Sequence, residues 1–142
     1  ENLKLLGAGA LLHDIVHSAM HEELVNKQGK LSDTEFNLFK THVAEGINIL
    51  RKHEGLAKES LKLILHHHEK MNGKGYPFLL TGNKISFLGQ IAAIADAYDM
   101  LTTTRPYRNA LTSFQALSTI IKEVDRYDPM LLKIFIKILV RE

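Results

Sequence analysis

Residues 57–77 have the sequence AKESLKLILHHHEKMNGKGYP, an amphipathic stretch that runs into a glycine-bearing loop. Its apolar residues recur at the three- and four-residue spacing of one helix face, so we predict a helix over about residues 57–70. His67 and His68 fall on the apolar side of that helix, whereas His66 shares a face with charged residues and is expected to meet solvent. Residues 71–84 are predicted to form a polar loop.

The same helical periodicity extends over the rest of the chain, and no convincing strand pattern is present. We predict further helices over about residues 3–16, 32–52 and 86–102, from Thr112, and after Pro129. The first and third of these are apolar on almost every side, which is typical of helices buried all round. The apolar stripe of the last helix indicates core or a homodimer surface. The predicted fold is therefore all-α, with residues 1–142 forming a single domain.

Composition excludes several classes of protein. The 142 residues include 45% hydrophobic and 24% charged residues, with a formal net charge of +2, and no Cys. The small charge argues against a nucleic-acid polymer as partner. The apolar stretches are too short for membrane insertion. The absence of cysteine excludes disulfides and thiolate chemistry, and it is consistent with the cytoplasmic location that we expect.

Ionisable side chains on the apolar helix faces are the informative feature of this sequence. His42 lies on the core side of the predicted helix 32–52, and Asp14 and Asp96 lie near the C-terminal ends of the two apolar helices. Each residue alone has an ordinary explanation: a hydrogen-bonded core histidine, or an aspartate paired with Arg105 or Arg108. Together with the inward histidines of residues 57–70, they would all be satisfied by one or two divalent metal ions.

Four motifs carry a resemblance to a known family. His13-Asp14 resembles the signature of the HD superfamily of helical, metal-dependent phosphohydrolases. Three further stretches resemble its HD-GYP branch, whose known activity is hydrolysis of cyclic di-GMP. These are KTH at residues 40–42 with Gly46, HHEKMNGKGYP at residues 67–77, and IADAYD at residues 94–99 followed by RPYR at residues 105–108.

The resemblance implies roles for individual residues. It implies a bundle with a metal site between helices, in which two divalent ions, usually iron or manganese, are bound by His13, Asp14, His42, His67, His68 and Asp96. Asp14 would bridge the ions, with His13 and Asp96 on one of them and the three other histidines on the second. Substrate binding would involve Tyr76, Pro77, Asp99, Arg105 and Arg108. The loop of residues 75–77 would also offer a surface to a protein partner.

The chain departs from the family pattern in two places. Val16 and His17 stand where the family has Gly-Lys, and that lysine contacts the phosphate. His17 lies one helical turn after His13 and is a candidate proton donor in its place, so we assign catalytic roles to Asp14 and His17. The family also draws ligands from a helix upstream of the His-Asp pair, and we expect this domain to be N-terminally incomplete.

The leading functional hypothesis is a phosphodiesterase that hydrolyses cyclic di-GMP, with two metal ions activating water for attack on phosphorus. The first alternative is a degenerate domain that binds a cyclic dinucleotide without turnover, a binding or signalling module. The second is a general HD phosphohydrolase that acts on other nucleotides. The replacement of the family lysine by His17 and the missing upstream ligand motivate the first alternative, and equal or faster turnover of mononucleotides would favour the second.

Overall fold

The computed structural model describes residues 1–15, 20, 22–53, 55–105 and 108–140, and over these residues it is helical without a β-sheet. This confirms the predicted all-α fold. The helices, in chain order, are α1 (Asn2–Leu12), α2 (Glu22–Val25), α3 (Asp33–Lys40), α4 (His42–Leu50), α5 (Lys58–His66), α6 (Phe87–Thr102), α7 (Ser113–Lys122) and α8 (Pro129–Leu139), with short 3₁₀ turns η2 (Gly82–Lys84) and η3 (Val124–Arg126).

Capping residues mark where several helices begin. Ser32 and Glu35 form the reciprocal pair of hydrogen bonds of a capping box at the start of α3. Thr112 and Gln115 form a second box at the start of α7. Such boxes satisfy amide groups that have no partner within the first helical turn. Both starts agree with the sequence prediction.

The single helix predicted over residues 32–52 is divided into α3 and α4 at Thr41. The backbone N–H and the hydroxyl group of Thr41 both donate hydrogen bonds to the carbonyl of Leu38, at 3.1 and 2.8 Å. A threonine hydroxyl that bonds a carbonyl in the preceding turn competes with the regular helical ladder and bends it. The interruption makes His42 the first residue of α4.

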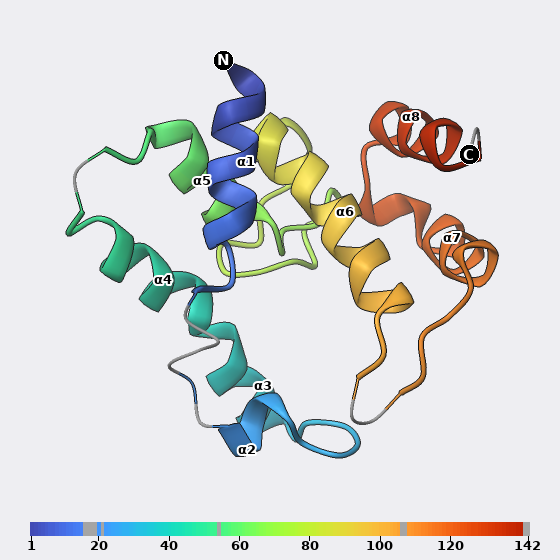
Figure 1. Cartoon of the computed structure of the whole chain (residues 1–142), viewed down its shortest axis with the longest axis horizontal. Coiled ribbons are helices and arrows are strands. Elements are labelled where there is room, and N and C mark those ends of the chain that lie inside the picture. Colours follow the sequence, from blue (N-terminus) through green and yellow to red (C-terminus); the bar gives the residue numbers. More distant parts are fainter. Residues whose placement is uncertain (16–19, 21, 54, 106–107, 141–142) are drawn as a thin grey trace.

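Helix α6 crosses the centre of the molecule and joins two packed regions (Figure 1). On one side α5 packs against α6 and also receives α1 and α4, around a core that includes Ile47, Leu63 and Ile64. On the other side α7 and α8 pack against α6 around a second core that includes Ile94 and Ile120. The ends of α1 and α5 and the start of α4 therefore meet beside α6.

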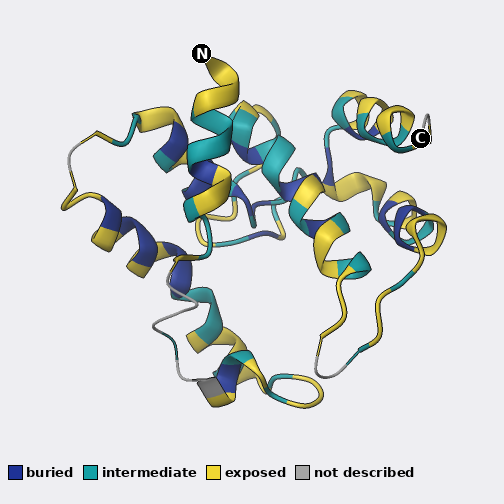
Figure 2. Cartoon of the chain, viewed as in Figure 1, coloured by how far each residue is buried: buried dark blue, intermediate teal, exposed yellow. Residues whose placement is uncertain are grey.

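Helix α1 is not buried all round, contrary to the sequence prediction (Figure 2). Leu3 and Leu11 are 84% and 86% exposed, and only Gly9 of α1 is buried. The reason is that α1 packs on one face only, against α5. In α8, Phe135 packs on the core while Ile134 and Ile138 are exposed, and a homodimer through this helix stays a prediction.

Among the described residues, no helix is long and apolar enough to cross a membrane.

Candidate metal centre

The six predicted ligands come from four separate segments and meet at one place. His13 and Asp14 follow the last turn of α1, and His42 begins α4. His67 and His68 follow α5, which ends at His66 rather than at residue 70 as predicted. Asp96 lies in the middle of α6. The predicted ligand residues thus lie at or just beyond helix ends in every segment except α6.

These residues form two groups, within each of which the candidate ligand atoms lie within 4.8 Å of one another. One group contains His13, Asp14 and Asp96, and the other contains Asp14, His42, His67 and His68. Asp14 belongs to both groups through different oxygens. Its Oδ2 lies 3.2 Å from Nε2 of His13, and its Oδ1 lies 3.5 Å from Nε2 of His42 and 3.7 Å from Nε2 of His67.

Local backbone hydrogen bonds hold three of the imidazole rings. His13, His42 and His67 each place Nδ1 2.7 Å from the carbonyl oxygen of the residue three positions earlier. A carbonyl oxygen only accepts, so Nδ1 carries the hydrogen and Nε2 of the neutral ring keeps its lone pair. Such a bond from the second nitrogen is what orients metal-ligating histidines in proteins. The three Nε2 atoms all face Asp14.

Two buried imidazole nitrogens indicate whether these residues fit a metal ion. His67 is fully buried and His68 is 18% exposed, and Nε2 of each ring has no hydrogen-bond partner within the described part of the chain. A buried polar atom left without a partner costs free energy, roughly 1–3 kcal/mol. A cation beside Asp14 would satisfy both nitrogens. The all nitrogen and oxygen donor set suits divalent ions such as iron, manganese or zinc, and the residues therefore fit a divalent metal.

Electrostatics within the site follow from burial and from the shared carboxylate. The hydrogen bond to Asp14, opposed by burial, raises the pKa of His13 to about 9. Burial, and the neighbouring rings of His67 and His42, lower the pKa of His68, so this ring is neutral at pH 7. Burial also raises the pKa of Asp96. Removing charged groups from water disfavours their charged forms, and an added cation would reverse that effect on the carboxylates.

The loop after His68 is held by Glu69, whose role the sequence reasoning did not identify. Glu69 is 1% exposed, and its carboxylate accepts hydrogen bonds from the backbone N–H groups of Phe78, at 2.6 Å, and Leu80, at 2.8 Å. These bonds fold the loop back so that the ring of Tyr76 stacks on His68, with ring centroids 4.6 Å apart. The available signal was an acidic residue directly after two inward histidines.

Two glycines shape this loop for different reasons. Gly73 has a φ of +75°, a left-handed conformation that glycine permits. Gly75 does not have a positive φ, and a glycine is required there for a different reason. A Cβ at position 75 would lie 2.4 Å from the backbone of Glu69 and Lys70. The missing side chain therefore allows the loop to pass directly over the end of α5.

The predicted substrate-binding residues do not all share one cavity. A central cavity of about 560 Å³ is lined by Asp14, His68 and Asp96 together with Tyr76 and Arg105. A smaller cavity of about 250 Å³ beside His13 includes Asp99 and Arg105. Pro77 and Arg108 line other cavities, and the Arg108 guanidinium donates a hydrogen bond to the carbonyl of Met100.

Three further predictions have mixed outcomes. His66 is half-buried rather than solvated, because its Nδ1 accepts a hydrogen bond from the backbone N–H of Ser86, at 2.9 Å. The alternative ion pairs of Asp96 are not formed: within the described ranges, neither Arg105 nor Arg108 lies within 4.0 Å of its carboxylate. His17 lies outside the described residues.

Comparisons with known proteins agree with this arrangement. The model of the HD domain family matches residues 2–131. A cyclic di-GMP phosphodiesterase of Pseudomonas aeruginosa is 35% identical over 131 residues, which are 92% of this chain and 32% of the relative. A 3′3′-cGAMP-specific phosphodiesterase of Vibrio cholerae is 33% identical over 128 residues, which are 89% of this chain and 24% of the relative. The chain thus spans about a third or less of these relatives.

A solved structure shows the same fold. An HDG"Y"P protein from Bdellovibrio bacteriovorus superposes with a TM-score of 0.76 at 26% sequence identity, over 95% of this chain and 43% of that protein. The superposition agrees with the all-α architecture of this chain. The chain belongs to the HD domain family and, within it, to the HD-GYP branch.

Proposed function

We propose that residues 1–142 form one phosphohydrolase domain that hydrolyses cyclic di-GMP with two divalent metal ions, iron or manganese. The observation that carries this proposal is the position of Asp14, which belongs to both ligand groups and lines the central cavity. A carboxylate shared by two groups of ligands is suited to a pair of adjacent ions. The names of the relatives support the choice of a cyclic dinucleotide as substrate.

The residues of the chain divide the work between holding metals and holding substrate. His13, Asp14 and Asp96 would hold one ion, while Asp14 and the three remaining histidines would hold the other. When bound, the ions would supply Lewis-acid activation of the phosphodiester and of water. The catalytic role proposed for Asp14 is to contribute a carboxylate to both ligand groups, so that the two ions would be held next to each other.

Substrate contacts are proposed for residues that line the cavities around this centre. Arg105 lies where its guanidinium can bind a phosphoryl oxygen at the central cavity, next to Asp14 and Asp96. Tyr76 forms a wall of the same cavity and keeps the imidazole of His68 in place by stacking. We retain Pro77, Asp99 and Arg108 as proposed substrate contacts from neighbouring cavities. His17 is the proposed proton donor to the leaving oxygen.

The test is reconstitution followed by product analysis. The purified chain is loaded anaerobically with iron or manganese, the bound metal is counted, and cyclic di-GMP and 3′3′-cGAMP are offered separately before chromatography. We expect close to two ions per chain and turnover of cyclic di-GMP, abolished by Asp14→Ala. Faster turnover of 3′3′-cGAMP would move the substrate assignment to that dinucleotide. Two bound ions without turnover of either compound would contradict the enzyme and favour the binding module.

A surface for a protein partner remains a proposal. Gly75 is buried and Tyr76 faces the histidines, whereas Pro77, Phe78 and Leu79 directly after them are exposed. We propose that a partner of this loop contacts these three residues. Cross-linking from position 78 in the full-length protein is the direct measurement.

A further inference from the structure

A second cavity adjoins the central one on the side of His68. It measures about 740 Å³ and shares with the central cavity five lining residues: Phe36, His68, Lys70, Tyr76 and Arg126. We call it the side cavity. Its size is within the usual range of small-molecule sites, roughly 300–1,000 Å³. Of the six candidate metal ligands, only His68 lines it, so it lies beside the metal centre and not over it.

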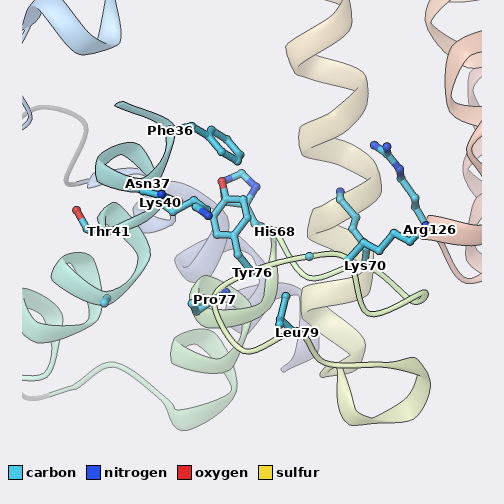
Figure 3. A pocket seen from close by; sticks show the side chains of 13 residues that line it. Phe36, Asn37, Lys40, Thr41, His68, Lys70, Tyr76, Pro77, Leu79 and Arg126 are labelled. Carbon is cyan, nitrogen blue, oxygen red and sulfur yellow. The ribbon is translucent and has the colours of Figure 1, made fainter. Parts of the chain in front are cut away.

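The side cavity is lined by cations and by no acidic residue. Its four charged residues are Lys40, Lys70, Lys74 and Arg126, and none of its thirteen lining residues is Asp or Glu (Figure 3). Figure 3 shows Lys40 on one side of the overlapping His68 and Tyr76 rings, and Lys70 and Arg126 on the other. A positively charged lining of this kind attracts an anion into the cavity.

None of the three lysines of this cavity makes an ion pair with the described residues. The ammonium groups of Lys40 and Lys70 lie over aromatic rings, each 5.0 Å from a ring centroid, those of Phe36 and Tyr127. By contrast, Lys27 elsewhere is paired with Glu35 at 2.6 Å, and Arg126 is paired with Glu123 at 3.0 Å. A ring does not neutralise the charge of an ammonium group, which leaves Lys40 and Lys70 able to bind phosphate.

Aromatic rings supply the second half of a nucleotide site. The ring of Phe36, which is 44% exposed, meets that of Tyr76 edge-on with centroids 6.1 Å apart. Stacking of a base on such a ring is worth about 1–3 kcal/mol. The side cavity therefore combines cations for a phosphate with aromatic surface for a base.

We propose that the side cavity binds the second, non-reacting nucleotide of a cyclic dinucleotide, with Lys40 and Lys70 holding its phosphate. A cyclic dinucleotide carries two phosphates on opposite sides of one ring, and only one of them can lie against Asp14 and Asp96. The other projects away from the metal centre, and the cavity next to His68 has the charge to receive it. This inference rests on the proposed function and names the residues that select a dinucleotide over a simple phosphodiester.

The experiment compares two substrates in a lysine variant. Bis(p-nitrophenyl) phosphate has a scissile phosphodiester but no second phosphate. For Lys40→Met, which keeps an unbranched side chain and removes the charge, we expect kcat/KM for cyclic di-GMP to fall about tenfold, the value of one charged hydrogen bond. The factor by which kcat/KM falls for bis(p-nitrophenyl) phosphate should be at least five times smaller than the factor for cyclic di-GMP. Lys40→Arg should restore most of the cyclic di-GMP activity. Lys133→Met, at an exposed lysine of α8, is the charge-matched control and should leave kcat/KM unchanged for both substrates.

Equal losses on the two substrates, or no loss on cyclic di-GMP, would overturn the inference. A binding measurement separates this result from failure of the proposed function. Equilibrium dialysis of cyclic di-GMP against chelator-treated protein requires no turnover. A Kd about tenfold weaker in Lys40→Met than in Lys133→Met supports the side cavity even if the wild-type protein hydrolyses nothing. Equal affinities, or no binding by the wild-type protein, would overturn it.

Discussion

At the scale of single residues, short-range hydrogen bonds prepare the centre before any metal is bound. His13, His42 and His67 each hydrogen-bond the carbonyl of the residue three positions earlier, so the local backbone helps to orient all three rings. The loop with Tyr76 is different, because it depends on the single buried carboxylate of Glu69. A carboxylate that accepts two backbone hydrogen bonds in the interior cannot be replaced by a group that also donates.

The substitution Glu69→Gln tests whether the loop requires a carboxylate at this position. One amide oxygen remains to accept, but the new NH₂ group faces a backbone N–H, and one buried donor loses its partner. We expect Glu69→Gln to lower the free energy of unfolding by about 1–3 kcal/mol. Urea denaturation followed by circular dichroism measures the change. Glu59→Gln, at an exposed position of α5, is the control and should change it by about 0.5 kcal/mol or less. Similar effects of the two substitutions would contradict the role of Glu69.

At the scale of elements, the position of α1 decides where His13 and Asp14 lie. Helix α1 contacts α5 through Gly9, where a Cβ would lie 2.9 Å from Cδ1 of the fully buried Leu63. The glycine therefore allows a close approach of two helices, which brings the end of α1 beside the end of α5. Gly7, in the same helix, has nothing within 4 Å of its potential Cβ.

The two glycines of α1 therefore predict opposite effects of the same substitution. Gly7→Ala should raise the free energy of unfolding by about 0.5–1 kcal/mol, because alanine loses less backbone entropy in a helix. Gly9→Ala gains the same helical preference but forces Leu63 to move, and overpacking of a core costs about 1–3 kcal/mol. We expect a net loss of stability in Gly9→Ala, measured by the same denaturation. Equal stabilisation by both would show that α1 does not pack closely on α5.

At the scale of the whole molecule, the metal centre ties together segments that are distant in the chain. The candidate ligands directly follow α1 (residues 13–14) and α5 (residues 67–68), begin α4 (residue 42) and lie within α6 (residue 96). A metal that binds only the folded arrangement must stabilise it by mass action. Metal content and folding stability are thus linked in this protein, independently of any catalytic activity.

Thermal unfolding with and without metal measures this linkage. A free ion at 100 times its Kd adds about 2.7 kcal/mol of stability. For a domain of this size, that gain corresponds to a rise in Tm of roughly 5–10 °C with manganese over chelator. His67→Ala should reduce the rise substantially, whereas His53→Ala, at an exposed histidine, should keep it. An equal rise in both variants would place the stabilising ion elsewhere.

Local sequence was sufficient to predict most of the helices, though not α2, and the inward side of most functional residues. Capping boxes at Ser32 and Thr112, and the apolar spacing before His67 and His68, depend on neighbours within one or two turns. Such interactions are present in the sequence itself, which is why these predictions agree with the structure. The family motifs extended this to the identity of the ligands.

Packing between segments determines the features that were not predicted from the sequence. The division of the helix at Thr41 and the end of α5 at His66 could not be predicted from periodicity, which continues through both positions. The exposure of Leu3 and Leu11 follows from the packing of α1, which is mainly against α5, and not from its own composition. Glu69 finds its partners nine and eleven residues later. Interactions between neighbouring residues thus specify most of the helices and the types of ligand. Packing between segments specifies which groups meet, because those contacts join residues far apart in the chain.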